Sequence, residues 1–419
     1  MKYMKKFGLA VMLFAIIMSL VACGSDSSKE KESSSKGNTL TVSVEETYKP
    51  FIDEIKGQFE KDNDVKVKVV EKPMFDQLEA LPLDGPGGNA PDVLMSAYDR
   101  VGSLGQQGHL LETKDNENNK LDEKAKQTVT IDGKRFGTPF TVETLVQFYN
   151  KDLVDKAPAT MQEAEALAKD PRFSFANEPG KSTAFLADWN DFYILYGELA
   201  GYGAYTFGKD GTDPKDVGLN NKGAVEGLEY ATKWYNDIWP QGMKDAKSAK
   251  DLINQMFIEG KAASIISGPW AATNYKEAKV NYGVAKLPTL PNGKEYTPFS
   301  GGKAWVASAY SQQPELAQKW IDYVTNEENS YKFYEHVNEI PMNKAAQEKV
   351  IATNDELAKA VIETYEVAQP MPNIPEMGEI WTAGATLMAD AISGKKTPKQ
   401  AAEAAVKTIN ENIEQKYNN

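Results

Sequence analysis

The stretch from residue 40 to residue 70, LTVSVEETYKPFIDEIKGQFEKDNDVKVKVV, decides the fold class. Residues 40–44 and 65–70 alternate between apolar and polar side chains at period two, which predicts two β-strands. Between them, apolar residues recur at helical spacing over residues 48–61, which predicts an amphipathic helix. The three elements form a βαβ unit, and this unit indicates an α/β protein.

The alternation of strands and helices continues along the chain, without an internal repeat. Residues 93–95 predict a short buried strand with a loop after it, and a helix between Ser248 and Gly260 is followed by a predicted strand over residues 262–266. In open α/β sheets, ligands bind beyond the carboxyl ends of the strands. Three residues lie at such ends: Asp99, Arg100 and Trp270.

The first 22 residues predict a secretory signal. Three lysines precede an apolar run from Phe7 to Ala22, which is shorter than the roughly 20 residues that a transmembrane helix needs. The tetrapeptide LVAC at residues 20–23 resembles the lipobox of bacterial lipoproteins. We therefore expect cleavage before Cys23, a diacylglyceryl group on Cys23, and a protein held at the extracellular face of the cell membrane.

Composition sets limits on the remainder of the chain. Cys23 is the only cysteine, so we expect no disulfide, thiolate metal site or cysteine nucleophile in the mature protein. Residues 23–38 are rich in Ser, Lys and Glu, which predicts a flexible tether. The part from Thr39 onward has about 380 residues, more than one core usually supports, so we expect two lobes. The formal net charge of −13 argues against nucleic acid and against a second, electrostatic contact with the membrane.

Signatures of catalysis and of cofactors are weak. Residues 180–183, GKST, match the end of a phosphate-binding loop, but Phe175 stands where that motif requires a glycine. His109 and His336 lie far apart without a zinc motif or a nucleophile partner, so we expect no metal and no cofactor. Because the chain has 60 acidic residues, a glycosidase pair of carboxylates remains an alternative, and a secreted glycoside hydrolase is the hypothesis from another class.

Tryptophans near loops indicate a different kind of site. Sugars have apolar C–H faces beside rings of hydroxyls, so a sugar site needs aromatic rings for stacking and charged or amide groups for hydrogen bonds. The other four tryptophans occur in apolar or helical settings that favour core packing. The three candidates for stacking are Trp189, Trp270 and Trp381.

Short segments spread along the chain carry a family resemblance, and they occur in the same order as in that family. They are FEKD at 59–62, APDV with AYDR at 90–100, VETL and YNKDLV at 142–154, ISGPW at 266–270, VNYGV at 280–284 and MPNIPEM at 371–377. From Leu40 onward the chain resembles the maltose/maltodextrin-binding proteins of ABC importers, which are extracellular solute-binding proteins. Residues 76–93 are similar to those of the lipid-anchored Gram-positive members.

The resemblance implies a fold and its boundaries. The fold is the two-lobed α/β fold of periplasmic-type binding proteins, class II, with discontinuous lobes and a ligand cleft at the hinge. The N-terminal lobe would comprise residues 39–142 and 299–351. The C-terminal lobe would comprise residues 143–298 and 352–419.

The resemblance also implies ligand-binding residues. The acid and base of the cleft match Asp99 and Arg100, and Glu143 matches a cleft glutamate. A stacking segment of the family aligns with residues 187–193, where Trp189, Phe192 and Tyr193 are alternatives and we select Trp189. A stacking tryptophan of the family falls on Ser96, with Tyr98 as a substitute, and a cleft arginine falls on Ala385. The remaining matches are Met371 and the stacking residues Trp270 and Trp381.

The implied function is binding without catalysis. The protein would bind maltose or longer maltodextrins by closing its cleft, and would deliver them as a monomer to the membrane permease of an ABC importer. Other oligosaccharides, such as cyclodextrins or α-1,6-linked glucans, remain alternatives within the same class.

Overall fold

The βαβ unit predicted at the start of the domain is confirmed in the computed structural model. Strand β1 (Thr39–Val44), helix α1 (Lys49–Asn63) and strand β2 (Lys66–Glu71) follow one another, and the two strands pair in parallel. The apolar face of α1 is buried, and Asp64 ends the helix in the left-handed conformation. The structure describes residues 38–116, 119–121 and 123–417, so the predicted signal, the lipidation site Cys23 and most of the tether lie outside the described residues.

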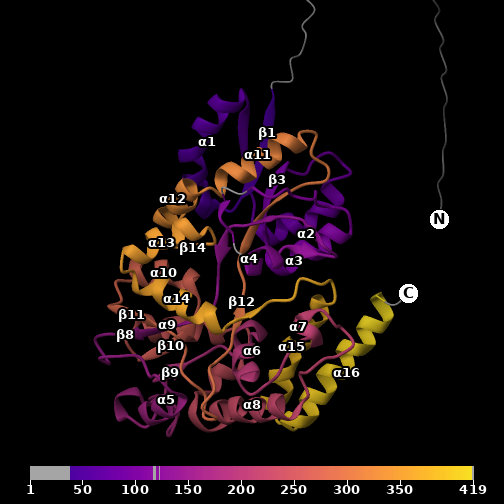
Figure 1. Ribbon diagram of the computed structural model, residues 1–419. Helices are drawn as coiled ribbons and strands as arrows, with labels where there is room; N and C mark the ends of the chain where they lie inside the picture. The colour runs from indigo at the N-terminus through magenta and orange to yellow at the C-terminus, as the bar shows by residue number, and fades with distance from the viewer. Residues whose placement is uncertain (1–37, 117–118, 122, 418–419) are drawn as a thin grey trace, which may run out of the picture. The chain divides into compact units, whose positions relative to one another are not determined.

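The first sheet has five strands in the order β2-β1-β3-β13-β6. Strand β3 (Val93–Ala97) pairs in parallel with β1, and β13 (Lys303–Ala307) pairs with β3 in the opposite direction. The paired strands β3 and β13 are thus about two hundred residues apart in sequence, and Figure 1 shows the orange helix α11 beside the purple strands. Strand β6 is Thr138–Pro139, and the helices of this region are α2 (Met74–Asp84), α3 (Tyr98–Gln106), α4 (Glu123–Gln127), α11 (Pro314–Val324), α12 (Glu327–Val337) and α13 (Lys344–Ala352).

The second sheet has four strands in the order β11-β8-β10-β9. Strand β8 (Val146–Asn150) is antiparallel to β10 (Ser264–Ser267) and to β11 (Tyr282–Ala285), and β9 (Phe185–Leu186) is parallel to β10. The helices of this region are α5 (Met161–Leu167), α6 (Phe192–Gly201), α7 (Gly208–Gly211), α8 (Lys222–Lys233), α9 (Ala249–Ile258), α10 (Ala272–Glu277), α14 (Glu356–Val367), α15 (Met377–Ile392) and α16 (Pro398–Tyr417).

Short strand pairs join the chain segments that pass from one sheet to the other. Strand β12 (Phe299–Ser300) pairs in parallel with β15 (Gln369–Pro370), and Glu143 forms an antiparallel bridge with Gly301. The first two crossing segments, near Glu143 and Gly301, therefore contact each other, with β15 beside them, and this is where a hinge between two lobes must lie. The remaining strand pairs are β7 (Thr141–Val142) with β14 (Ile340–Pro341) and β4 (Thr130–Ile131) with β5 (Lys134–Arg135).

Asp99 and Arg100 lie in a helix, which corrects the predicted loop. Helix α3 begins at Tyr98, directly after β3, and these two residues form its first turn. The apolar residues Val101 and Leu104 continue the helical spacing and are buried. Both charged side chains are consequently carried on a regular element at the carboxyl end of a strand.

Candidate ligand-binding cleft

The acid of helix α3 is buried beside an aromatic ring of another helix. The Asp99 side chain is only 9% exposed, and Arg100 Nε lies 3.5 Å from its Oδ2. Burial raises the pKa of Asp99, while the charge of Arg100 and a hydrogen bond from the Trp381 indole act in the opposite direction. Asp99, Arg100 and Trp381, three predicted ligand-binding residues, are thus in one place although they are far apart in sequence.

A cluster of charged side chains lies at the crossing segments. Lys303 Nζ forms ion pairs with Glu143 and, at 2.9 Å, with Glu339, and Tyr48 donates a hydrogen bond to Glu339. Burial lowers the pKa of Lys303, but the attraction of the two carboxylates outweighs this effect, and the net pKa is well above the usual range. The pKa of Glu143 is raised, with burial as the largest cause and the neighbouring Lys303 acting in the opposite direction. Glu143 was predicted from the resemblance, whereas its partners were missed.

An aromatic group adjoins these charges. Trp270, 45% exposed, follows strand β10 in the short turn at Pro269–Ala271, and its ring centroid lies 6.1 Å from that of Tyr193. A Cβ built on Gly301 would lie 3.4 Å from the Tyr193 hydroxyl and 3.8 Å from Met371 Cε. Tyr193 and the predicted residue Met371 therefore lie beside Gly301, the residue that also pairs with Glu143.

The ring of Phe299 connects the two sides of this aromatic group. Its centroid lies 6.1 Å from Tyr193 and 5.8 Å from Trp381, and the ring stacks on Tyr196 at 3.7 Å. Phe192 lies edge-on to Trp381 with the centroids 6.1 Å apart. These buried rings thus hold the partly exposed rings of Tyr193 and Trp381 in place. Because those side chains are already ordered, stacking of a ligand on them costs less conformational entropy.

Trp189 does not lie in the cleft, and this corrects the choice made from sequence. The side chain is fully buried, its ring lies 4.8 Å from that of Trp239, and its Nε1 donates to the Tyr296 hydroxyl at 3.1 Å. The Asp191 side chain accepts from the backbone N–H of Tyr193 and begins helix α6 there. Of the three alternatives in this segment, the structure brings Tyr193 to the cleft.

Tyr98 is also placed in the core rather than in the cleft. It is fully buried, and its hydroxyl donates to the backbone carbonyl of Thr141 at 2.6 Å. A buried phenol with a satisfied hydroxyl stabilises the fold but offers no surface to a ligand. The prediction that Tyr98 replaces a stacking tryptophan is corrected accordingly.

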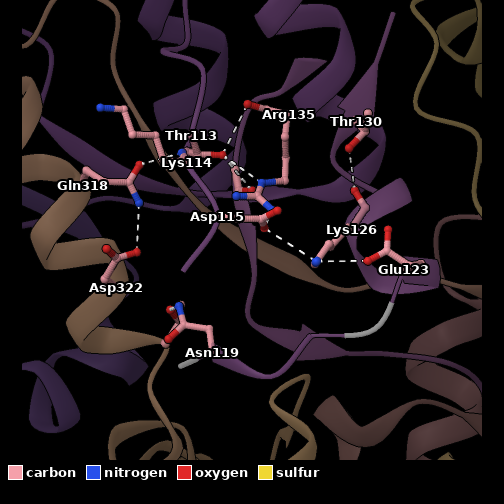
Figure 2. Close-up of polar contacts among 12 residues, drawn as sticks. Thr113, Lys114, Asp115, Asn119, Glu123, Lys126, Thr130, Arg135, Gln318 and Asp322 are labelled. Atoms are coloured by element: carbon pink, nitrogen blue, oxygen red, sulfur yellow. Dashed lines mark hydrogen bonds and ion pairs between the residues drawn. The ribbon is translucent and has the colours of Figure 1, made fainter. Parts of the chain in front are cut away.

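One group of charged side chains outside the cleft is paired within the protein. The Asp115 carboxylate forms an ion pair with Arg135 and lies 3.7 Å from Lys126 Nζ, which also contacts Glu123 at 3.0 Å (Figure 2). Among the described residues, no three His, Cys, Asp or Glu side chains are arranged to hold a metal ion. None of the helices in the described part of the chain has the length and apolar character of a membrane span.

The cleft suits a ligand that has both hydroxyls and apolar faces. Carboxylates, a guanidinium and an ammonium can exchange hydrogen bonds with hydroxyls, and the rings of Trp270, Tyr193 and Trp381 can stack on C–H faces. Two α/β sheets joined by crossing segments, with such a cleft beside the crossing, define a two-lobed solute-binding protein.

The chain belongs to the bacterial extracellular solute-binding proteins, whose family model matches residues 54–360. It is 58% identical to the maltodextrin-binding protein MdxE of Bacillus subtilis over 413 residues, which are 98% of this chain and 99% of that protein. It is 46% identical to a maltooligosaccharide ABC transporter solute-binding lipoprotein of Streptococcus pneumoniae R6, over 99% of both chains. Among solved structures, the maltose-binding protein MalE of Listeria monocytogenes in complex with maltose has a TM-score of 0.86 and 62% sequence identity, covering 91% of this chain and 100% of that chain.

Proposed function

We propose that this protein binds maltose and maltodextrins outside the cell and delivers them to the membrane permease of an ABC importer. The observation that carries the proposal is a group of aromatic rings near buried carboxylates. The rings are Tyr193, Trp270 and Trp381, and the carboxylates are those of Asp99 and Glu143. The similarity to maltodextrin-binding proteins over nearly the whole chain supports the choice of ligand. No cofactor is needed for this function.

Each cleft residue has a role in this proposal. Asp99, Arg100 and Glu143 bind sugar hydroxyls, while Trp270 and Trp381 stack on the pyranose faces. Tyr193 takes the stacking role that sequence alone had assigned to Trp189, because Tyr193 adjoins Trp270 and Trp189 does not reach the cleft. The Met371 side chain adds an apolar contact beside Tyr193.

Binding and closure are linked in the proposed mechanism. The ligand residues belong to two lobes, for which we propose residues 39–142 with 299–351 and residues 143–298 with 352–419. The pairing of β13 with β3 supports the first grouping, and the packing of α15 and α16 against α8 supports the second. A sugar that contacts both lobes only in the closed state has a higher affinity for that state, and this difference in affinity closes the cleft.

The first test is a calorimetric or tryptophan-fluorescence titration of the purified protein with maltose, maltotriose and longer maltodextrins. We expect saturable binding, and we expect Trp270→Ala and Trp381→Ala each to weaken it by about tenfold or more, equivalent to about 1.4 kcal/mol. Leu83→Ala is a suitable control because Leu83 is 82% exposed and does not line the cavity that contains Asp99 and Trp381. If both tryptophan variants bound maltotriose within about threefold of the unmodified protein, the stacking roles would be wrong.

The same preparation distinguishes the alternatives. Cyclodextrins and α-1,6-linked glucans are titrated in parallel, and tighter binding of either would replace maltodextrin as the ligand. Incubation with maltodextrins followed by an assay for new reducing ends tests for catalysis. We expect no sustained release, because the proposed role of the carboxylates is hydrogen bonding; turnover would favour the hydrolase hypothesis.

A further inference from the structure

A cavity of about 210 Å³ extends from Asp99 and Trp381 toward helix α2. Helices α2 and α3 and the start of α15 supply its walls. The cavity therefore adjoins the cleft, yet one of its walls is an element that contributes none of the predicted ligand-binding residues. Its lining includes Phe75, Glu79, Asp99, Arg100 and Trp381.

Phe75 is an exposed aromatic residue that core packing does not explain. It is 49% exposed, whereas Met74, Leu78 and Leu81 on the same helix are buried and form its core-facing side. Exposure of a large apolar ring to water is unfavourable, and a ring exposed in a cavity beside polar groups is typical of a binding site.

Arg100 links Phe75 to the cleft. The Arg100 guanidinium carbon lies 5.9 Å from the centroid of the Phe75 ring, within the range of a cation–π contact. The same guanidinium group forms the ion pair with Asp99. Arg100 is therefore held on one side by a carboxylate and on the other by the ring, and this contact restrains the orientation of Phe75.

The remaining lining matches a sugar unit. Glu79 lies four residues after Phe75 on α2, so the two side chains share one face of the helix. A carboxylate next to an exposed ring repeats the combination that Asp99 and Trp381 form across the cavity. A glucosyl unit between the two rings would have an aromatic face on each side and acceptors for its hydroxyls.

We propose that Phe75 stacks on a glucosyl unit at the outer end of the cleft and thereby favours longer maltodextrins over maltose. The inference rests on the proposed function and adds a chain-length preference to it. Maltose fills the inner part of the cleft near Glu143 and Trp270, and only a longer chain reaches Phe75.

The test compares Phe75→Ala with Leu83→Ala across maltose, maltotriose, maltotetraose, maltopentaose and maltoheptaose in calorimetric titrations. Leu83 is a matched control because it lies on the same helix, is 82% exposed and does not line the cavity. We expect Phe75→Ala to bind maltose within about twofold of the unmodified protein and the longer chains about fivefold or more weakly, whereas Leu83→Ala changes neither. We expect Phe75→Tyr to retain most of the affinity for long chains, because it keeps the ring.

Three results would overturn the inference. An equal loss for maltose and for long chains would place Phe75 in the inner site, and no loss at any length would remove it from the cleft. Failure of the unmodified protein to bind any of these sugars would overturn the proposed function together with the inference. Thermal unfolding of both alanine variants shows whether they are folded, and we expect no change because both side chains are exposed.

Discussion

At the scale of single residues, Lys303 balances the charge of two buried carboxylates in the cleft. Its ammonium lies between the carboxylates of Glu143 and Glu339, and all three side chains are less than one-fifth exposed. Removal of one partner from a buried ion pair typically destabilises a protein by about 3–5 kcal/mol, because an uncompensated charge stays buried. We expect Lys303→Met to lower the free energy of unfolding at pH 7.5 by about this amount, as measured by denaturant titration.

The pH dependence of this loss identifies its origin. Glu143 already has a raised pKa, and removal of Lys303 raises it further, so the variant takes up a proton in the folded state and regains stability as the pH falls toward 5. In the unmodified protein the ammonium of Lys303 remains charged over this range. A loss of equal size at pH 5 and pH 7.5 would contradict the explanation. Lys303→Met/Glu143→Gln should recover part of the loss, whereas Lys222→Met, at an exposed pair, should change stability by less than about 0.5 kcal/mol.

Single residues are also where sequence reasoning succeeded and failed most clearly. The motifs pointed to Asp99, Arg100 and Trp381, which the structure brings to one cavity, while their roles in binding stay predictions. Trp189 was selected over Tyr193 because the local sequence does not show whether a tryptophan is exposed or buried. That depends on contacts with residues far along the chain. The partner that decides the matter is Tyr296, more than one hundred residues away, whose hydroxyl accepts from the Trp189 indole. Lys303 was missed for the same reason, since its two carboxylates come from other segments.

At the scale of elements, helix α3 depends on a glycine for its contact with the segment before α15. A Cβ built on Gly102 would lie 2.0 Å from the backbone carbonyl oxygen of Asn373, so only glycine permits the observed approach. The Asn373 side chain also donates to the backbone carbonyls of Thr128 and Thr130 at 3.1 and 3.0 Å. The segment that carries Met371 toward Trp381 is thus held against the helix that carries Asp99.

Gly102→Ala should disturb this contact. The added methyl group must displace backbone, so we expect a loss of about 1–3 kcal/mol in the free energy of unfolding and weaker binding of maltotriose, because Met371 and Trp381 shift relative to Asp99. Gly57→Ala is the matched control: it lies inside helix α1 with no atom within 4 Å of the built Cβ. Alanine has the higher helix propensity, so the control should gain about 0.5–1 kcal/mol and bind normally. Unchanged stability of Gly102→Ala would show that the segment can move without loss.

Elements were predictable where a local pattern defines them. Thr397 and Gln400 have the sequence pattern of a capping box, and they form its two reciprocal hydrogen bonds, of 3.0 and 3.2 Å, at the start of α16. Helix α3 was mistaken for a loop because its N-cap residue, Ala97, has no side chain that can cap a helix. The two-residue strands at the crossing segments, such as β12, are too short to show a period of two.

At the scale of the whole molecule, periodicity predicts the α/β class but not the path of the chain. Strand β13 has the composition of a buried strand, yet nothing local indicates that it pairs with β3, two hundred residues earlier. The family resemblance supplied this long-range order, and the two-lobed solute-binding fold is confirmed by the similarity to solved structures. The cleft is a product of that order, because elements that line it, such as α3 and α15, are far apart in sequence.

The lipid anchor predicted at Cys23 would keep the whole molecule at the membrane. An importer gains from a binding protein that is kept near its permease, and a lipid with two acyl chains holds a protein at a membrane stably. We expect Cys23→Ser to appear in the medium with unchanged affinity for maltodextrins, while uptake of labelled maltotriose by the cells falls, as measured by fractionation, titration and a transport assay. Ser27→Ala, four residues further along, should remain with the membrane and support normal uptake. Retention of Cys23→Ser on the membrane, or uptake at the normal rate despite its release, would show that this cysteine does not tether the protein to its transporter.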